Sequence, residues 1–296
     1  MRTSARLKLI ITLCIGFPCL AAANAELVAS LNLSSDVEGF GGFSGLEISD
    51  DGTEITAVSD KGRIMRGQIL RDANDNPIGV SEMRFAYVLG PNGARMQKWR
   101  EDAEGLAIDN RGRLYVSFEG EPGRVWRYDR FGGAATELPH AAFMDQMQKN
   151  SGLEGLAVDR SGSLFSLPER SGQLNRPFPV WRYRNGRWDQ PFSVPRHPPH
   201  LTVGLDIGPD NRLYLLERHF SGISFQTRIR RFDVVGDELQ NERILLDTPS
   251  GTHLNLEGIS VWRDADNVLR ITMIADDNFR SFLNTTLVEY RFPSLP

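Results

Sequence analysis

The chain has 296 residues, of which 40% are hydrophobic, so it is long enough to bury a sizeable core as one or two domains. Its 34 basic and 38 acidic residues give a net charge of −4, which argues against a nucleic-acid partner because phosphate binding needs a basic surface. Both cysteines, Cys14 and Cys19, lie near the N-terminus, so the rest of the chain has no thiol for a disulfide or a soft metal.

Residues 1–25 have the pattern of a cleaved secretory signal. A basic start with Arg2, Arg6 and Lys8 precedes an apolar run, and the segment ends at the small residues Ala23-Asn24-Ala25. An uncleaved anchor helix is the alternative, but the apolar run is shorter than the ~20 residues that a membrane span needs. We therefore expect residues 26–296 to form a single periplasmic or secreted domain with no stable membrane anchor.

Five repeats follow this segment, and each consists of an apolar run, a turn and a second apolar run that ends at an acid. Each repeat opens with a Gly-Leu or Gly-Ile pair, whose glycines are Gly45, Gly105, Gly155, Gly204 and Gly258. Their spacings of 60, 50, 49 and 54 residues are close to the ~40–50 residues of a propeller blade. Apolar residues alternate within each run, which indicates strands, and the small residues between them permit close packing near a crowded axis.

The last repeat lacks a fourth strand, because the chain ends shortly after its third apolar run at 286–292. The segment LVASLNL from Leu27 precedes the first repeat and has no partner of its own. Pairing the two closes the ring and removes an exposed sheet edge. The sequence thus predicts an all-β, five-bladed β-propeller closed by the N-terminal strand, with six blades as the alternative if residues 67–100 contain another one.

Acidic residues recur at two positions of the repeat that lie side by side in an antiparallel hairpin. At the start of the first strand stand Ser44, Glu104, Glu154 and Glu257, and the second strands end at Asp60, Glu119, Glu169, Glu217 and Asp276. Carboxylates that converge on one mouth of the ring repel one another unless a cation joins them. Oxygen ligands favour Ca²⁺ over Zn²⁺, with Mg²⁺ as the alternative.

The predicted metal ligands are Ser44, Asp60, Glu104, Glu154, Glu217, Glu257 and Asp276. The alternative interpretation is that these acids cap strands and form salt bridges with the many arginines.

Arginines follow several of these acids, and guanidinium groups bind phosphate in a bidentate fork. An anionic, phosphorylated ligand would therefore suit a cation surrounded by Arg170, Arg218 and Arg280. A carboxylate that does not bind the ion, Glu119 or Glu169, would take the proton from an attacking water. These five residues are the predicted catalytic set, and the alternative is that each arginine only neutralises its neighbouring acid.

The motifs AEGLAID, LEGLAVD and LEGISVW, each followed by a turn and a strand that ends in an acid, resemble the phytase-like domain family of secreted bacterial proteins, which is described as esterase-like. The similarity extends from about Gly41 to Phe292, and the Glu-Gly-Leu start is also similar to calcium-dependent propellers such as gluconolactonases and apyrases. The resemblance implies a calcium-binding channel near Glu104, Glu154 and Glu257, with Ser44 at the equivalent place. In the fourth copy Val203 stands where the glutamate would be.

From these features we expect a monomeric, calcium-dependent hydrolase that acts on an ester of an anionic small molecule, with a phosphate ester as the first choice. A lactonase or carboxylesterase that uses the same ion is the alternative enzyme. A propeller that binds a ligand without catalysis is the alternative from another class, because propellers host many functions.

Overall fold

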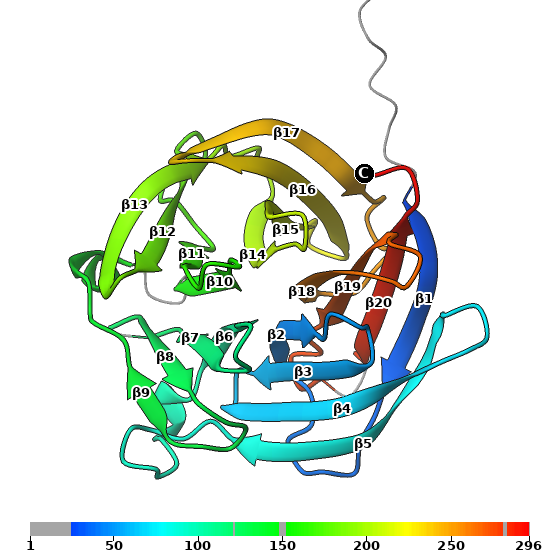
Figure 1. Cartoon of the computed structure of the whole chain (residues 1–296), viewed down its shortest axis with the longest axis horizontal. Helices are drawn as coiled ribbons and strands as arrows, with labels where there is room; N and C mark the ends of the chain where they lie inside the picture. Colours follow the sequence, from blue (N-terminus) through cyan, green and yellow to red (C-terminus); the bar gives the residue numbers. More distant parts are fainter. Residues whose placement is uncertain (1–24, 121, 148–151, 281–282, 296) are drawn as a thin grey trace, which may run out of the picture.

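The computed structural model describes residues 25–120, 122–147, 152–280 and 283–295, which form five four-stranded sheets arranged around a central axis (Figure 1). The predicted five-bladed propeller is confirmed, and the stretch 67–100 contributes the outer strand of the first blade rather than a sixth blade. The predicted secretory signal, with both cysteines, lies outside the described residues apart from its last residue. Across the described ranges, no helix has the length and apolar character needed to cross a membrane.

Each blade contributes one strand to each of four positions, counted from the axis outward. The innermost strands are β2 (Phe43–Ile48), β6 (Ala103–Ile108), β10 (Leu153–Val158), β14 (Leu201–Ile207) and β18 (Leu256–Arg263). The second strands are β3 (Glu54–Ser59), β7 (Leu114–Phe118), β11 (Leu164–Pro168), β15 (Arg212–Phe220) and β19 (Leu269–Ala275). The third strands are β4 (Arg63–Arg71), β8 (Arg124–Tyr128), β12 (Phe178–Arg184), β16 (Phe225–Val235) and β20 (Thr285–Phe292). The outermost strands are β5 (Pro77–Tyr87), β9 (Ala135–Glu137), β13 (Arg187–Val194), β17 (Glu238–Asp247) and β1 (Glu26–Leu33).

Two short 3-10 helices lie in loops of the second blade. One is η1 (Lys98–Arg100), in the loop that precedes β6, and the other is η2 (Ala142–Gln146), in the loop that follows β9.

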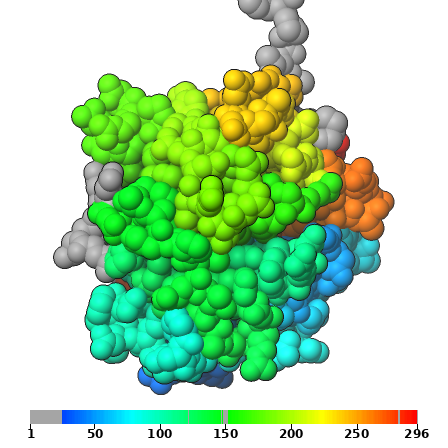
Figure 2. All heavy atoms as spheres, turned by 60° about the vertical axis from the view of Figure 1, so that its left-hand side comes forward, coloured from blue at the N-terminus to red at the C-terminus, as the bar shows by residue number. Residues whose placement is uncertain are grey.

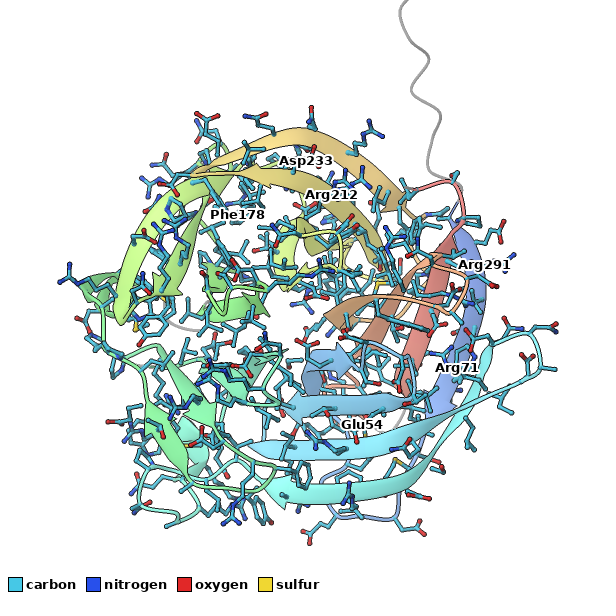
Figure 3. All side chains as sticks on the ribbon, viewed as in Figure 1. Glu54, Arg71, Phe178, Arg212, Asp233 and Arg291 are labelled. Atoms are coloured by element: carbon cyan, nitrogen blue, oxygen red, sulfur yellow. The ribbon has the colours of Figure 1, made fainter. Side chains whose placement is uncertain are left out.

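The N-terminal strand completes the fifth blade, as the sequence predicted. β1 pairs antiparallel with β20, with Ser30 opposite Val288. A buried ion-pair network joins this blade to the first one: Glu289 on β20 accepts hydrogen bonds from Arg71 at 3.0 Å and from Arg270 at 3.2 Å. Figure 3 shows Arg71 beside the fifth blade. The first and the last strand of the described residues are therefore neighbours in the sheet that closes the ring.

The repeated glycines allow the innermost strands to pack closely around the axis. A Cβ atom at Gly105 would lie 2.7 Å from Leu156 Cβ and 2.8 Å from the Glu154 carbonyl oxygen, both in the next blade. The glycines of the other four blades face the innermost strand of the following blade in the same way. Close approach of backbones explains why each blade begins with this residue.

The core is divided among the five junctions between neighbouring blades, and the described residues form one buried apolar cluster at each junction. At the junction of the second and third blades, Tyr115 packs with Leu153 and Leu164. Trp188 reinforces this junction by donating a hydrogen bond of 2.9 Å to the Pro139 carbonyl. In the space-filling view of Figure 2 the side chains of these two blades lie against each other. Burial between blades, rather than within one sheet, therefore stabilises the ring.

Aspartates shape the turns between first and second strands. Asp159 Oδ1 accepts hydrogen bonds of 2.9 Å from the backbone N–H groups of Ser161 and Ser163, and Asp109 holds the equivalent turn of the second blade. These side-chain turns keep each hairpin short. They lie at the end of the innermost strands opposite to the acidic mouth described below.

Candidate functional site

A β-bulge interrupts every innermost strand at the residue before the repeated glycine. In each blade the pairing with the second strand skips this residue. The skipped residues are Ser44, Glu104, Glu154, Val203 and Glu257. Bulges re-aim side chains and are common beside active sites. Burial, followed by the charges of neighbouring carboxylates that include Glu257, raises the pKa of both Glu104 and Glu154 well above its usual value. The three glutamates therefore converge, as the sequence predicted, although they come from separate blades.

A second position of each blade adds carboxylates to the same mouth. The residue just before each bulge pairs with a residue of the second strand, and the next residue of the second strand occupies this position. The five residues found there are Asp60, Glu119, Glu169, Arg218 and Asp276. Burial first, and neighbouring carboxylates after it, raise the pKa of Asp60 and of Asp276 to about 7. Glu257 is among the charges that act on both. Two independent positions of the repeat thus supply acids to one end of the ring.

Glu217 lies outside this group. It pairs with Thr202, which places it one residue before the mouth position that Arg218 occupies. Because successive strand side chains point to opposite faces, its carboxylate is directed away from the mouth. The Glu217 side chain is fully buried and accepts hydrogen bonds of 2.7 Å from Arg228 and of 2.6 and 2.9 Å from Arg230. The structure therefore places Glu217 in a buried ion-pair network and not with the other predicted ligands.

Three carboxylates of the second blade form the tightest acidic group among the described residues. Oxygen atoms of Asp102, Glu104 and Glu119 all lie within 4.8 Å of one another. The Asp102 carboxyl is hydrogen-bonded to both partners, and burial raises its pKa. Burial and the charge of Asp102 raise the pKa of Glu119 to about 7, although the Gly152 N–H donates to Glu119 at 3.3 Å. Only part of this group can be ionised without a positive partner.

The first and fifth blades complete the acidic mouth with Asp60, Asp276 and Asp277. The Oδ1 atom of Asp60 is buried and accepts no hydrogen bond. Asp277 is used locally, because its Oδ1 accepts from the backbone N–H of Gly42 at 3.0 Å and of Phe279 at 2.9 Å. Gly42 has φ +63°, and a Cβ there would lie 2.6 Å from Asp60 Oδ1. Glycine is therefore required where the chain passes Asp60.

This donor set fits a hard divalent cation. It consists of carboxylate oxygens at short mutual distance, together with a buried Asp60 oxygen that lacks a partner. Ca²⁺ takes about 6–8 such oxygens in flexible geometry. Ser44, at the equivalent bulge of the first blade, is also buried and adds a hydroxyl oxygen.

Arg218 places one guanidinium group among these acids. Its Nη1 donates to Glu257 and to Asn255, and its Nη2 donates to Glu169 at 3.4 Å. Burial alone would disfavour its charge, but Glu257 and Glu169 raise its pKa above the usual value. The fourth blade thus supplies a cation at the position where the other four supply an acid.

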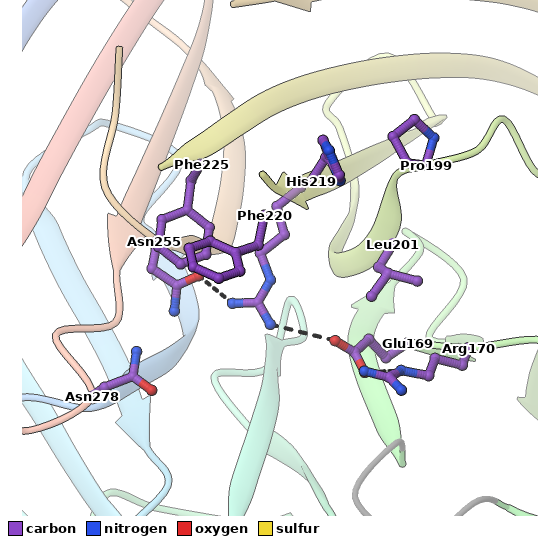
Figure 4. Close-up of a pocket in the computed structure, with 10 residues that line it drawn as sticks. Glu169, Arg170, Pro199, Leu201, His219, Phe220, Phe225, Asn255 and Asn278 are labelled. Atoms are coloured by element: carbon purple, nitrogen blue, oxygen red, sulfur yellow. Dashed lines mark hydrogen bonds and ion pairs between the residues drawn. The ribbon is translucent and has the colours of Figure 1, made fainter. Parts of the chain in front are cut away.

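A cavity of about 320 Å³ adjoins Arg218 (Figure 4). Its walls combine Arg170, whose Nε lies 3.0 Å from Glu169, with the aromatic pair Phe220 and Phe225, whose rings are 4.9 Å apart. Two guanidinium groups beside aromatic rings are suited to a ligand with an anionic group and an apolar part. Arg280, the third predicted arginine, is exposed in the loop after Asp277, and its N–H donates to the Asp277 carbonyl at 2.9 Å.

The family model "Phytase-like: Esterase-like activity of phytase" matches residues 38–279. The chain belongs to this phytase-like family. None of the curated proteins matches it.

Solved structures share the fold of this phytase-like chain at low sequence identity. An endo-arabinase from Bacteroides thetaiotaomicron matches with a TM-score of 0.51 and 13% identity over 91% of this chain and 96% of that one. The PQQ-bound form of an aldose sugar dehydrogenase from Streptomyces coelicolor matches with a TM-score of 0.50 and 12% identity over 91% and 98%. A calcium-binding regucalcin from Agrobacterium tumefaciens has a TM-score of 0.44 and 10% identity over 86% and 79%. At these identities the first two likenesses show the propeller fold alone.

Two residues of the phytase-like site were not predicted from the sequence. Asp102 and Asn255 each stand two residues before a bulge glutamate, and their carbonyls accept the N–H of Glu119 and of Asp276 at 2.9 Å. The shared pattern of an Asp or Asn two residues before Glu-Gly, in DAEG and NLEG, was visible in the sequence and could have identified both.

Proposed function

We propose that this phytase-like protein binds Ca²⁺ at the acidic mouth and hydrolyses an ester of an anionic small molecule, with a phosphate ester as the first choice. The observation that supports the proposal is the convergence of bulge glutamates from three blades with Asp60, Asp102 and Glu119. So many half-buried carboxylates at one end of the ring are costly without a cation. Mg²⁺ is the alternative ion, and its stricter octahedral geometry suits this irregular set less well.

Asp102 and Glu104 would hold the ion, together with Glu119 or with other carboxylates of the acidic mouth, which are Glu154, Glu257, Asp60 and Asp276. When bound, the ion would polarise the ester oxygen and lower the pKa of a coordinated water. Glu217 has no part in this proposal, because its carboxylate is occupied by Arg228 and Arg230.

The side chains of the fourth and third blades would bind and orient the substrate. Arg218 and Arg170 face the cavity beside the acids, so they would hold the anionic group and the charge that develops on it. Phe220 and Phe225 would cover the apolar part of the ester and exclude water. Glu119 or Glu169, whichever is not bound to the ion, would accept the proton of the attacking water. Arg280, which is exposed in the loop after Asp277, would add positive charge at the rim.

Calcium binding is tested by thermal unfolding of the protein with and without Ca²⁺. We expect Ca²⁺ to raise the melting temperature, and the double variant Glu104→Gln/Glu154→Gln to lose that gain. Without the ion this variant should be at least as stable as the wild type, because both carboxyls have raised pKa values. The control Glu38→Gln/Glu238→Gln removes the same charge from exposed positions and should keep the gain. No response of the wild type to Ca²⁺ or Mg²⁺ would contradict the metal site and favour a network of salt bridges.

Catalysis is tested by a hydrolysis screen of phosphate monoesters, phosphate diesters and lactones, each with and without chelator. We expect chelator-sensitive hydrolysis of a phosphate ester, with Arg170→Gln raising KM more than it lowers kcat. Chelator-sensitive activity on lactones alone would favour the lactonase or carboxylesterase alternative. A calcium response without activity on any substrate would favour a ligand-binding propeller. We also propose that the protein is exported and acts as a monomer, which cell fractionation and sedimentation would test.

A further inference from the structure

A second cavity, of about 520 Å³, lies against the second blade beside the acidic mouth. Two arginines, Arg100 and Arg124, line it together with apolar side chains that include Trp126, Leu138 and Met144. It shares no lining residue with the cavity beside Arg218. The proposed hydrolysis does not use it.

Arg124 is the most unusual residue of this cavity. The residue is only 9% exposed, and its guanidinium lies 4.4 Å from the ring centre of Phe118 and 4.9 Å from that of Trp126. Its Nη atoms donate to the carbonyl oxygens of Glu119 and Arg100, whereas its buried Nε has no hydrogen-bond partner. Within the described residues, no carboxylate forms an ion pair with it. The group is therefore fixed in position but incompletely satisfied.

Arg100 adds a second positive charge to the same cavity. Glu137 also lines the cavity, but it is exposed, and among the described residues neither arginine forms an ion pair with it. A buried N–H donor without a partner and two positively charged side chains that line one cavity both favour a bound anion.

We propose that the Arg100–Arg124 cavity is a binding site for an organic phosphate monoester. Its phosphate group would lie between the two guanidinium groups, and its apolar part would pack against Trp126, Leu138 and Met144. A phosphate monoester carries nearly two negative charges near neutral pH, so it matches two arginines better than a carboxylate does. The volume is within the ~300–1,000 Å³ of small-molecule sites.

The test is calorimetric titration of the wild-type protein with phenyl phosphate in the presence of EDTA, so that binding is measured without calcium and without turnover. We expect phenyl phosphate to bind about tenfold more tightly than benzoate or inorganic phosphate, since benzoate has one charge and inorganic phosphate has no apolar part. Arg100→Gln should weaken binding at least about tenfold. Arg111→Gln, an exposed arginine of the same blade, should bind as the wild type does.

Arg170→Gln separates this site from the cavity at the mouth and should leave the affinity within about twofold. Arg124→Gln should abolish binding, and circular dichroism tests whether this variant is folded. If the variant is not folded, the affinity of Arg100→Gln alone decides whether the assignment holds. Absence of binding to the wild type, unchanged affinity in Arg100→Gln, or loss of affinity in Arg170→Gln would overturn the assignment. None of these outcomes depends on whether the protein hydrolyses esters.

Discussion

The buried network around Glu217 offers a direct test of how the fourth blade differs from the others. Glu217→Gln would replace the carboxylate that accepts three hydrogen bonds of 2.6–2.9 Å from Arg228 and Arg230. Gln is nearly isosteric but presents an NH₂ group to one of these donors, and Arg230 is fully buried. Removal of one partner from a buried ion pair costs about 3–5 kcal/mol.

The lower end of that range applies here, because Arg230 keeps a bond of 2.9 Å to Glu242 and another to the Pro195 carbonyl. We therefore expect the free energy of unfolding to fall by about 3 kcal/mol and the melting temperature by roughly 6–12 °C. Urea unfolding followed by tryptophan fluorescence measures the first quantity. The control Glu242→Gln alters a partly exposed partner of the same arginine and should cost about 1 kcal/mol or less.

Glu217→Gln also distinguishes an ion pair from a metal ligand. If Glu217 has only the structural role, the rise in melting temperature on addition of Ca²⁺ should equal that of the wild type. A variant of wild-type stability that has lost its response to Ca²⁺ would refute the reasoning, because it would place the carboxylate in the mouth.

Two further predictions concern the axis of the ring. Gly105→Ala would bring a Cβ atom to 2.6 Å from Ser117 Oγ and should lower the free energy of unfolding by about 1–3 kcal/mol. The control Gly79→Ala, whose Cβ would have its nearest contact at 3.9 Å, should change the free energy of unfolding by less than about 0.5 kcal/mol. Equal effects of the two variants in urea unfolding would contradict the packing argument. Toward the other end of the innermost strands, burial raises the pKa of Asp206 to about 7 and, together with the charge of Asp206, raises that of Glu47. The folded state therefore keeps protons that the unfolded chain releases near pH 4, so without calcium this pair should contribute about 2–3 kcal/mol to the fall in stability between about pH 5 and about pH 8, in addition to the contribution of the acidic mouth. Asp206→Asn should reduce the fall by about that amount, and an unchanged pH dependence in this variant would exclude Asp206 as a source.

The repeat carried most of the information about the fold. Strand alternation and the spacing of the Gly-Leu pairs predicted the blades, and the unpaired segment at Leu27 predicted how the ring closes. Both inferences depend on local pattern and on the cost of an open sheet edge, which a single sequence displays. The convergence of Glu104, Glu154 and Glu257 was also accessible, because equivalent positions of a closed ring must meet at one end.

The face of the strand to which an acid points was the feature that the repeat pattern predicted least well. In LYVSFE and LFSLPE the acid is the sixth residue, whereas in LYLLER the acid Glu217 is the fifth and Arg218 is the sixth. A shift of one residue moves a side chain to the opposite face of a strand, so the similar motif conceals a different environment. The bulges are a related case, because their position becomes evident only when both partner strands are aligned.

The fourth blade makes the charge distribution of the acidic mouth asymmetric. Val203 and Arg218 stand where the other blades have a serine or glutamate and an acid, so a ring that would otherwise be uniformly negative has one apolar and cationic sector. Arg218 draws Glu169 and Glu257 toward itself, which leaves Asp102, Glu104 and Glu119 of the second blade as the tightest group of acids. A cation is therefore best held near the second blade, and an anionic group is best held near the fourth. Because the fourth repeat departs from the pattern, the mouth has separate places for the two opposite charges of the proposed function, the metal ion and the anionic group of an ester substrate.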